Sequence, residues 1–512
     1  MLKYKIKDNY IYVKDEGVHP LMKTVMVQVG FTRKGKYWRA QDDALRRSML
    51  SIPVANQNGV YDELTFEEIE KQYPFLREFQ KTDVKEMVEK ETMLNANTMG
   101  LGKTLETIIA LDILGSELNL IICPKSVRGY WKSELIKWLS VSEDDINIIE
   151  GTPKQREKKV KNLKKYNIIN YELLRNHTNE TMKALRKTKW DSIVCDEAHR
   201  IKGRDAKQTE GVKLLNAKHK FALTGTPIQN MPNDLWSILH WLDPYWSGRS
   251  YWRFVETFCE VEENFFGKEI KGLTPNEYNQ EALRTILSEI MIRREHDASL
   301  PDKIEIPISL EMTNKHAKMY KQVTEEIIIE LQEEKIMLIN SALTRLLRLQ
   351  QCTSNPGKFD IKDNPKFEFI KELIEDNPDK KVVVFSRFKE TINALEEYLK
   401  VPTVKLTGDT KGRDAAIKKF QNKKTRAFLA TIGAAGEGIN GLQEVSDTMI
   451  FIDKDWSPAK NQQAVGRLVR QGQKNPVKVY SLNLVGTIDD HVENLLNRKV
   501  SDIIEVLENQ QC

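Results

Sequence analysis

The period of the hydrophobic positions changes along the chain and divides it into segments of different expected structure. From about residue 71 onward, short apolar runs rich in β-branched residues alternate with stretches of helical period. Four of these runs occupy residues 119–124, 166–171, 191–197 and 220–226. Runs of this length that are apolar on both faces are typical of strands in a buried parallel sheet, with helices between them. We therefore expect an α/β lobe over residues 71–300.

The alternation is lost between residue 235 and about residue 353, where the hydrophobic spacing becomes helical and ends in a heptad-like stretch at residues 316–349. We expect a helical insertion at about residues 235–290 and a further helical insertion or linker at residues 301–360. The β/α rhythm resumes in runs at residues 380–386, 426–431, 447–453 and 477–485. This return predicts a second α/β lobe over residues 361–512.

The first 70 residues differ from both lobes. Apolar stretches at residues 10–13 and 24–29 are interpreted as strands, and a basic and aromatic run follows them. We expect a small β-rich accessory domain here. The predicted fold class is therefore α/β, with two parallel-sheet lobes, helical insertions between them and this N-terminal domain; no internal repeat or low-complexity tract interrupts the pattern.

Composition and charge limit the classes of protein. With 40% hydrophobic and 30% charged residues, most of the 512 residues can fold into globular domains. The 79 basic and 74 acidic side chains leave a net charge of +5, too dilute to coat polyanions in general, so any nucleic-acid site must be local. No stretch of about 18 apolar residues occurs and charges interrupt the amino terminus, so we expect neither a membrane span nor a signal peptide.

The cysteines point to a reducing compartment. They are Cys123, Cys195, Cys259, Cys352 and Cys512. Because they lie far apart and form no CxxC pair, the spacing argues against a zinc site and against a disulfide framework.

A glycine-rich string before a helical pattern is the strongest chemical signal. It consists of Met99, Gly100, Leu101, Gly102, Lys103 and Thr104. Glycines let backbone N–H groups approach phosphates at a helix N-terminus, whose dipole favours anions. In such a loop Lys103 meets the β and γ phosphates of ATP, and the Thr104 hydroxyl binds Mg²⁺. A plain glycine turn is the alternative reading.

Two adjacent acids follow an apolar run about ninety residues further along the chain, at Asp196 and Glu197. We expect them at the carboxyl end of a buried strand, where α/β sheets bind ligands. Asp196 is suited to hold Mg²⁺, and Glu197 to orient and deprotonate the attacking water. An ordinary acidic turn after a strand is the alternative reading. The occurrence of this acidic pair together with the glycine-rich string favours an ATP site.

These strings resemble motifs I and II of helicase superfamily 2, and further strings resemble the other motifs in the correct order. Residues 76–80 look like the adenine-contacting element, with Gln80 as the base reader. Residues 170–172 resemble motif Ib, and the string at residues 223–230, LTGTPIQN, closely resembles motif III of the Snf2 family of DNA-dependent ATPases. The resemblance covers roughly residues 70–490 and implies two RecA-like lobes with Snf2-type helical insertions.

The second lobe carries strings similar to motifs IV, V and VI, at residues 382–388, 436–440 and 463–473. The resemblance places Gly436, Gly438 and Gln463 at the nucleotide. It also implies that Arg467 and Arg470 reach the phosphates across the cleft, where they would neutralise charge in phosphoryl transfer. Two departures occur: residues 97–98 replace an acidic pair, and residues 468–469 replace the usual Ala-His. Neither removes a group that phosphate chemistry requires.

Several groups are candidates for DNA contact. On loops after strands, backbone phosphates are expected to meet Lys125, Ser126, Asn170, Tyr171, Lys405 and Thr407, although capped turns are an equal alternative. The N-terminal basic and aromatic run, which consists of Arg33, Lys34, Lys36, Tyr37, Trp38 and Arg39, is either a nucleic-acid surface or a strand with its tryptophan in the core. For the basic run at residues 154–165 a solvated helix face is favoured over a DNA contact. For Trp236, Trp241, Trp246 and Trp252, core packing is favoured over base stacking.

The leading hypothesis is an ATP- and Mg²⁺-dependent motor that moves on duplex or branched DNA and remodels it by branch migration, fork regression, annealing or protein displacement. One alternative is a strand-separating helicase that tracks on single-stranded DNA or RNA. The other is a non-catalytic clamp that binds ATP and nucleic acid. We expect a monomer in the cytoplasm of a bacterial or phage-infected cell, associated with the nucleoid when in use, with contacts mainly to the DNA backbone.

Overall fold

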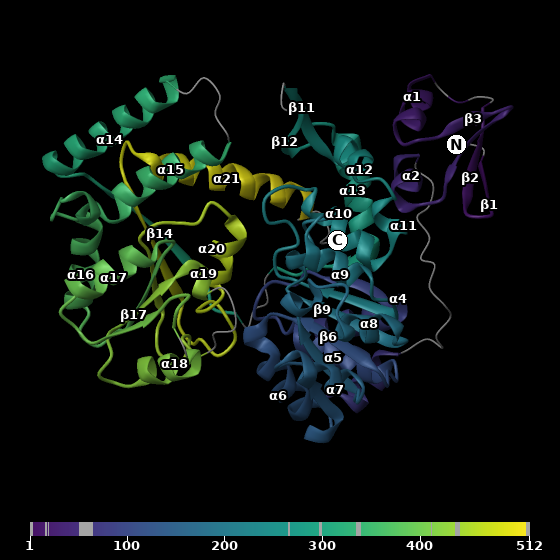
Figure 1. Ribbon diagram of the computed structural model, residues 1–512, viewed down its shortest axis with the longest axis horizontal. Helices are drawn as coiled ribbons and strands as arrows, with labels where there is room; N and C mark the ends of the chain where they lie inside the picture. The colour runs from purple at the N-terminus through teal and green to yellow at the C-terminus, as the bar shows by residue number, and fades with distance from the viewer. Residues whose placement is uncertain are drawn as a thin grey trace. The chain divides into compact units, whose positions relative to one another are not determined.

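The computed structural model describes residues 4–15, 18, 20–50, 65–264, 267–295, 300–333, 339–410, 412–435 and 441–507 (Figure 1). The chain forms two compact units. The first comprises residues 1–295 and 501–512, and the second comprises residues 296–500. Each unit is built around one large parallel sheet, and the two are described separately below.

The sheet of the first unit has seven strands in the order β13-β5-β10-β9-β6-β8-β7, and every pairing between neighbours is parallel. The strands are β5 (Thr92–Asn95), β6 (Asn119–Cys123), β7 (Ile146–Ile148), β8 (Tyr166–Asn170), β9 (Trp190–Asp196), β10 (Ala217–Leu223) and β13 (Met291–Ile292). The crossover segments contain α5 (Lys103–Ile113), α6 (Arg128–Trp138), α7 (Pro153–Val160), α8 (Glu180–Lys187) and α9 (Lys207–Lys213), and α3 (Phe66–Gln72) and α4 (Glu78–Lys90) precede β5. The predicted parallel sheet is confirmed.

The central strands are apolar on both faces because each face has its own core. In β6, Leu120 and Ile122 pack into one apolar cluster, whereas Ile121 and Cys123 pack into a second cluster on the other side. Successive side chains of a strand point to opposite faces, so a strand covered on both sides has no polar position left. The continuous apolar runs in the sequence are the consequence.

An insertion follows β10 and is partly helical. It contains α10 (Asp234–Leu242), α11 (Pro244–Ser247), α12 (Tyr251–Phe258) and α13 (Glu277–Ile290). It also contains an antiparallel hairpin of β11 (Cys259–Asn264) and β12 (Gly267–Leu273), so the prediction of helix throughout this segment is wrong at the hairpin. Trp236, Trp241 and Trp246 are buried in the core as predicted, whereas Trp252 is 40% exposed.

The N-terminal domain is a four-stranded antiparallel sheet in the order β1-β2-β4-β3. Its elements are β1 (Tyr4–Lys7), β2 (Tyr10–Lys14), α1 (Pro20–Gln28), β3 (Thr32–Lys34), β4 (Tyr37–Gln41) and α2 (Ala44–Met49). The stretch at residues 24–29, predicted as a strand, lies almost entirely in α1. The reason is its spacing: Met22, Val25, Met26 and Val29 recur at helical intervals and all pack on the core.

The sheet of the second unit has six strands in the order β14-β19-β18-β15-β17-β16, again with parallel pairings throughout. The strands are β14 (Lys303–Leu310), β15 (Val382–Ser386), β16 (Thr403–Leu406), β17 (Ala427–Thr431), β18 (Thr448–Phe451) and β19 (Val477–Leu484). β14 falls within the segment predicted to be helical, which corrects that prediction. It pairs only with β19 at the edge of the sheet, where Pro307 is tolerated although it has no N–H to donate.

The helices of the second unit are α14 (Asn314–Glu333), α15 (Ile339–Ser354), α16 (Pro365–Asp376), α17 (Lys389–Tyr398), α18 (Arg413–Gln421), α19 (Ile432–Ala435), α20 (Pro458–Val465) and α21 (Ile488–Leu507). The last turns of α21 belong to the first unit, whose core includes Val506 and Leu507.

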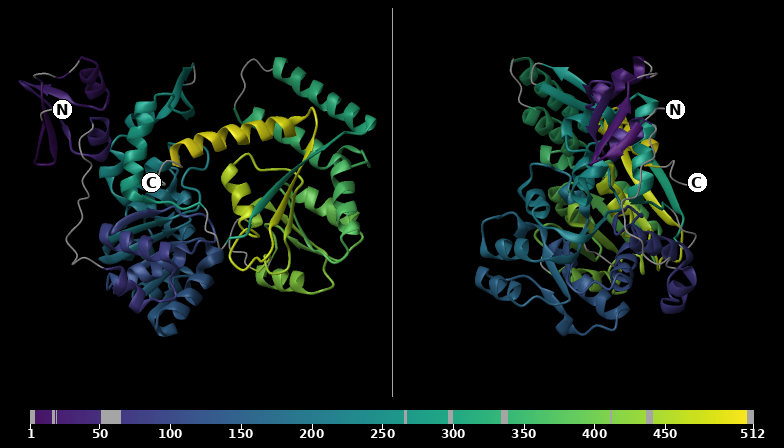
Figure 2. Two further views of the ribbon diagram at one scale, coloured as in Figure 1. Left: turned by 180° about the vertical axis from the view of Figure 1, so that it is seen from behind. Right: turned by 90° about the vertical axis from the view of Figure 1, so that its right-hand side faces the viewer.

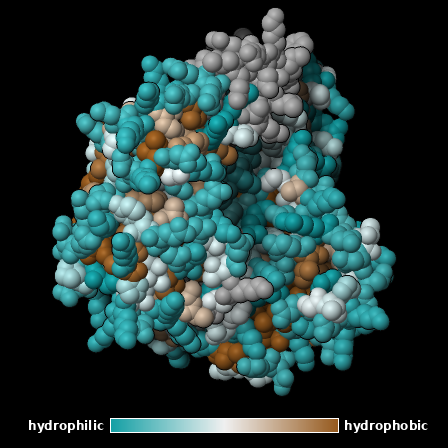
Figure 3. Space-filling model, turned by 60° about the vertical axis from the view of Figure 1, so that its left-hand side comes forward, coloured by the Kyte–Doolittle hydropathy of each residue, from teal (hydrophilic) through white to brown (hydrophobic). Residues whose placement is uncertain are grey.

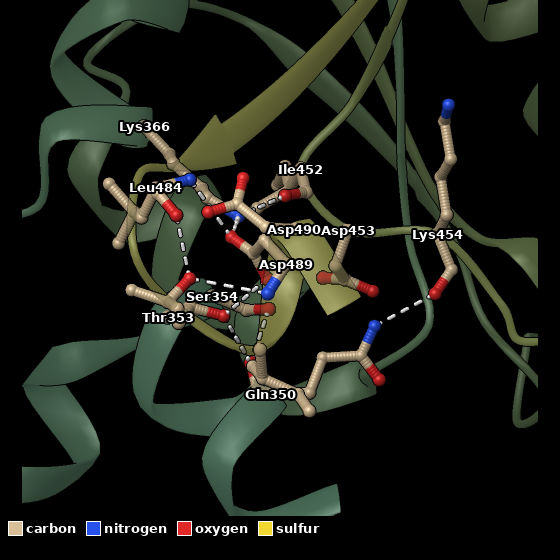
Figure 4. A network of polar contacts seen from close by, with 12 residues as sticks. Gln350, Thr353, Ser354, Lys366, Ile452, Asp453, Lys454, Leu484, Asp489 and Asp490 are labelled. Atoms are coloured by element: carbon tan, nitrogen blue, oxygen red, sulfur yellow. Dashed lines mark hydrogen bonds and ion pairs between the residues drawn. The ribbon is translucent and has the colours of Figure 1, made fainter. Parts of the chain in front are cut away.

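A buried polar network joins three helices to the sheet of the second unit (Figure 4). The Lys366 ammonium, with no exposed side-chain surface, donates to Asp489 Oδ2 and to the carbonyl oxygen of Ile452, both at 2.7 Å. Thr353 Oγ1 donates to Asp489 Oδ1 at 2.8 Å, and the backbone N–H of Leu484 donates to Oδ2 at 3.1 Å. The Asp489 carboxylate therefore ties α15, α16 and the start of α21 to the ends of β18 and β19.

On the face drawn in Figure 3, hydrophilic residues predominate and hydrophobic residues lie in separate small groups. Of the helices that the structure describes, none is both long and apolar enough to cross a bilayer.

Candidate nucleotide site and nucleic-acid surfaces

The glycine-rich loop connects β5 to α5 at the carboxyl edge of the first sheet. Gly100 and Gly102 have φ of +90° and +99°, a region that side chains with a Cβ rarely adopt. A Cβ on Gly102 would also lie 2.4 Å from Gln80 Nε2. Helix α5 begins directly at Lys103, and the N–H groups of its first turn have no intrahelical acceptor. The loop and helix therefore form an anion site suited to phosphates.

Lys103 is partly buried and folds back on this loop. Its Nζ donates to the carbonyl oxygens of Asn97 at 2.6 Å and Thr98 at 3.2 Å. Burial lowers the pKa of Lys103, while the carboxylates of Glu197, Glu106 and Asp196 act in the opposite direction. The ammonium thus lies in a field of negative charge.

Asp196 ends β9 and is held by donors on both carboxylate oxygens. Trp131 Nε1 donates to Oδ2 at 2.8 Å, and the backbone N–H of Glu197 donates to Oδ1 at 2.9 Å. Burial, followed by the neighbouring Glu197 carboxylate, raises the pKa of Asp196 to about 6. The side chain is fixed in position before any ligand binds.

Glu197 lies in a strained turn next to Asp196. Its φ of +52° is in the left-handed region, which costs a non-glycine residue of order 1–3 kcal/mol and recurs at functional sites. Glu197 Oε2 lies 3.3 Å from His199 Nδ1, and that nitrogen lies 3.3 Å from Thr224 Oγ1. The two acids are therefore linked to the loop after β10.

The loop after β10 closely approaches the glycine-rich loop, here called the phosphate loop, at Gly225. A Cβ at this position would lie 3.2 Å from Met99 Cγ and 3.6 Å from Lys103 Nζ. The loops after β5, β9 and β10 thus converge, as expected from the parallel order of these strands, and they bring together Met99, Lys103, Asp196 and Glu197. Thr104 lies in the first turn of α5.

Gln80, predicted to read adenine, lies on α4 against the phosphate loop. Its Nε2 donates to the carbonyl oxygen of Leu101 at 3.0 Å, and its Oε1 accepts from the N–H of Arg77 at 3.2 Å. It is only 4% exposed. The Gln80 side chain is therefore hydrogen-bonded to the phosphate loop itself.

A buried acidic cluster behind the phosphate loop was missed by the sequence reasoning. Asn97 Nδ2 donates to Asp83 Oδ2 at 2.7 Å and to Glu106 Oε2 at 3.2 Å, and Asn95 Nδ2 donates to Glu106 Oε2 at 2.7 Å. Arg294 forms an ion pair with Asp83 at 2.8 Å. The sequence marked Asn97 only as a departure from the family pattern. In the structure its side-chain amide donates hydrogen bonds to the carboxyl groups of both Asp83 and Glu106.

Burial raises the pKa of both carboxyl groups in this cluster, and that of Glu106 to about 8. The nearby Asp83 charge is the second cause for Glu106. The Arg294 guanidinium, which contacts Asp83, acts in the opposite direction on the pKa of Asp83. One feature of the sequence could have indicated this cluster: Glu106 lies among the apolar positions of α5, the helix that follows the phosphate loop.

Of the candidate DNA contacts in the first unit, Lys125 and Ser126 are exposed, on a short 3₁₀ turn (Lys125–Val127) after β6. The prediction does not fit Asn170 and Tyr171. The Asn170 side chain is buried and donates to Glu172 at 2.6 Å, and the fully buried Tyr171 donates its hydroxyl proton to the carbonyl oxygen of Asp196 at 2.6 Å. Tyr171 supports the turn at Asp196 and Glu197 from inside the protein.

In the second unit, the Lys405 ammonium forms an ion pair with Glu396 at 2.6 Å and donates to Asn393 Oδ1 at 3.0 Å. Thr407 is 4% exposed, so its hydroxyl is not presented on the surface. The Lys405 ammonium has partners within the lobe and its contact with DNA stays a prediction, whereas the buried Thr407 does not fit such a contact.

The motif VI residues follow the sheet of the second unit. Gln463 lies on α20, and Arg467 and Arg470 lie in the turns that follow it; Gln463 and Arg467 are 7% and 8% exposed. Gly436 and Gly438 fall outside the described residues.

The donor set in the first unit fits Mg²⁺. Among the described residues there is no cluster of three or more His, Cys, Asp or Glu side chains that would form a metal cage. Mg²⁺ in nucleotide sites needs no such cage, because it is bound by one or two protein oxygens, waters and the phosphates of the substrate. Thr104 and Asp196 are the residues that would hold it.

Comparisons with known proteins agree with this geometry. A sequence family described as the SNF2-related domain matches residues 79–358, more than half of the chain. The chain belongs to the SNF2 family. A second family, the helicase conserved C-terminal domain, matches residues 365–472. The predicted resemblance is confirmed.

Relatives occur in eukaryotes, bacteria and archaea. The chain is 29% identical over 439 residues to the ISWI chromatin-remodeling complex ATPase ISW2 of Saccharomyces cerevisiae, covering 78% of this chain and 37% of that protein. It is 28% identical to an uncharacterized ATP-dependent helicase of Mycoplasma genitalium, covering 88% of this chain and 44% of that protein. The chain thus spans less than half the length of either.

A solved structure is also similar in sequence. It is the Sulfolobus solfataricus SWI2/SNF2 ATPase core in complex with dsDNA, which is 30% identical, with 84% of this chain and 93% of that chain covered and a TM-score of 0.40.

Proposed function

We propose that this chain hydrolyses ATP to move along double-stranded DNA and to remodel branched or protein-bound DNA. The observation that carries the proposal is the convergence of Lys103, Asp196 and Glu197 at one edge of a parallel sheet, beside a helix N-terminus. These are the groups that phosphoryl transfer to water requires.

The groups divide the chemistry between them. The first turn of α5 and Lys103 bind the β and γ phosphates, and Thr104 and Asp196 hold Mg²⁺, which supplies positive charge to those phosphates when bound. Glu197 orients a water and accepts its proton as the water oxygen bonds to the γ phosphorus. The bond to the β–γ bridging oxygen breaks, and ADP and phosphate leave.

Arg467 and Arg470 neutralise the negative charge that develops on the transferred phosphoryl group, as arginine fingers supplied by the same chain. Their action requires the two units to close on ATP and to open after hydrolysis, a hinge motion that would move bound DNA in steps. Duplex DNA is favoured as the track because the string at residues 223–230 closely resembles motif III of the Snf2 family.

The test is steady-state ATP hydrolysis at one fixed salt concentration, with no nucleic acid, single-stranded DNA, linear duplex, fork or four-way junction. Stimulation by duplex or branched DNA supports the proposal. Stimulation by single strands alone replaces it with a strand-tracking helicase, and no turnover on any substrate replaces it with a clamp.

Two variants test the residue assignments. Lys103→Ala and Glu197→Gln should each reduce turnover by at least about a thousandfold, because each removes a group that acts on the phosphates or the water. DNA binding should remain within about twofold, since the contacts with DNA phosphates lie elsewhere. Hydrolysis that persists in either variant contradicts the assigned chemistry.

A further inference from the structure

The sheet of the N-terminal domain has one face covered by helices and one face that no helix of the described residues covers. Ile11, Val13 and Ala40 point to the covered face and pack with α1 and α2, which both lie on that side (Figure 1, Figure 2). On the opposite face the strand register aligns side chains from all four strands. They are Lys5, Lys7, Tyr10, Tyr12, Lys14, Thr32, Lys34, Tyr37, Arg39 and Gln41, here called the tyrosine–lysine face.

Strand alternation resolves the two readings of the basic and aromatic run in the sequence. Trp38 and Arg33 point to the covered side, where Trp38 Nε1 donates to Asp15 at 2.7 Å and Arg33 forms an ion pair with the same carboxylate at 2.8 Å. Lys34, Tyr37 and Arg39 point the other way. The strand therefore turns its tryptophan toward the core and presents alternate residues on the other face.

Cations and aromatic rings interleave on the tyrosine–lysine face. The Arg39 guanidinium lies 3.7 Å from the ring centroid of Tyr10 and 5.7 Å from that of Tyr12. Lys5 Nζ lies 5.0 Å from the ring centroid of Tyr37 and 5.5 Å from that of Tyr12. These cation–π contacts hold the charged groups over the rings without neutralising them.

No carboxylate opposes this charge within the sheet. Five of the six lysines and arginines in the four strands lie on this face, and the strands contain no aspartate or glutamate. Arg39 Nε is also buried without a hydrogen-bond acceptor among the described residues. Elsewhere in the chain basic side chains commonly face acids, as Lys405 faces Glu396. Positive charge gathered on one face of a sheet is complementary to a polyanion.

We propose that the tyrosine–lysine face binds single-stranded DNA. Lysines contact the phosphates, and bases stack on the tyrosine rings and on the guanidinium plane of Arg39, the combination that binds single strands without sequence preference. A duplex buries the faces of its bases and would leave the three tyrosines unused. The inference rests on the proposed function only in that DNA, rather than RNA, is the expected nucleic acid.

This face is fixed to the first lobe. Helix α2 packs against α11 and α13, Arg253 donates to the carbonyl oxygen of Val29 at 3.2 Å, and the Tyr278 hydroxyl hydrogen-bonds to the carbonyl oxygen of Met49. A strand bound on the tyrosine–lysine face is therefore attached to the same unit that carries the phosphate loop. A motor on duplex DNA that also grips a single strand is suited to forks and to branched DNA.

The experiment measures binding of the full chain to a fluorescein-labelled 25-nucleotide oligo(dT) and to a blunt hairpin duplex by anisotropy, without nucleotide. Lys5→Ala/Arg39→Ala should lose about tenfold or more of its affinity for oligo(dT), and the slope of log K against log salt should fall by about 1.4, because two charges are removed. Duplex affinity should change by less than about twofold. Lys423→Ala/Lys424→Ala, which removes two exposed charges from a turn in the second unit, is the matched control and should change neither.

The aromatic contribution is tested by Tyr12→Ala/Tyr37→Ala, which should weaken oligo(dT) binding, and by Tyr12→Phe/Tyr37→Phe, which retains the rings and should bind as the wild type does. Photo-crosslinking of 5-iododeoxyuridine DNA to the wild-type chain, mapped by mass spectrometry, should mark Tyr12 or Tyr37 without any substitution. Unchanged oligo(dT) binding in the alanine variants, an equal loss on the duplex, or crosslinks found only elsewhere would overturn the inference. DNA-stimulated ATP hydrolysis, measured in parallel, tests the proposed function separately.

Discussion

Replacement of Glu106 by glutamine should remove a pH dependence of folding that one buried proton creates. Glu106 is fully buried, and its pKa is raised from 4.5 to about 8 by burial and by the Asp83 charge. In the folded chain it is therefore protonated at pH 7, whereas in the unfolded chain it is ionised above about pH 4.5. A raised folded-state pKa stabilises the folded state fully below pH 4.5, and this contribution is lost as the pH rises to about 8.

The magnitude follows from linkage. Where the folded state holds one proton more than the unfolded state, the free energy of unfolding falls by about 1.4 kcal/mol per pH unit. Between pH 5.5 and 7.5 the contribution of Glu106 therefore falls by roughly 3 kcal/mol. The Glu106→Gln variant has no proton to lose there, so its stability relative to the wild type should rise by that amount across this range.

The assay is urea unfolding of wild type and variant at half-unit pH steps from 5.5 to 8.5, followed by tryptophan emission, with the transition of the first unit compared. Glu117→Gln, at an exposed carboxylate of the same unit, is the control and should give a difference that does not change with pH. A Glu106→Gln difference that is constant with pH would show that Glu106 is ionised in the folded state and would refute the reasoning.

Three further predictions follow from the contacts. Trp131→Phe removes a hydrogen-bond donor from Asp196, so the pKa of Asp196 should rise. The acid limb of the ATPase pH profile should then shift to higher pH, with kcat reduced about tenfold at pH 6 and less at pH 8. An unshifted limb contradicts the role of this bond. Lys366→Met leaves the buried Asp489 carboxylate without its ion-pair partner and should destabilise the second unit by about 3–5 kcal/mol in urea unfolding. The double variant Lys366→Met/Asp489→Asn should recover part of this loss. Equal losses of stability in the single and the double variant would argue against the ion pair. Gly225→Ala places a methyl group against Met99 and should lower kcat about tenfold with the fold intact by circular dichroism, whereas wild-type turnover would mean that the two loops adjust freely.

Much of the fold was determined by the sequence alone. Strands such as β6 and β15 are apolar on both faces, and only burial between two layers accounts for such runs, so they identified both parallel sheets. The failures came where one pattern fits two structures. The apolar residues in and just after α1 that pack on the core recur at helical intervals, although several neighbours are β-branched, and β14 is an edge strand whose exposed, alternating residues carry a weak signal.

The positions of the proposed catalytic residues were also readable, because parallel strands bring their carboxyl ends to one edge and so place Lys103, Asp196 and Glu197 together. Only the tertiary structure decided which way neighbouring side chains point. It turns Tyr171 inward to Asp196, although the sequence put it on a DNA-facing loop. It also gathers Asp83 and Glu106, from two different helices, around Asn97.

The tyrosine–lysine face shows the same division. The sequence marked the run at residues 33–39 but left its role open, because a run of residues in a strand serves two faces at once. Register then joins Arg39 and Tyr37 to Tyr12 and Lys5, more than twenty residues away. Composition and local spacing determine which elements form; long-range pairing determines which side chains share a surface, and that information is absent from any single stretch of the chain.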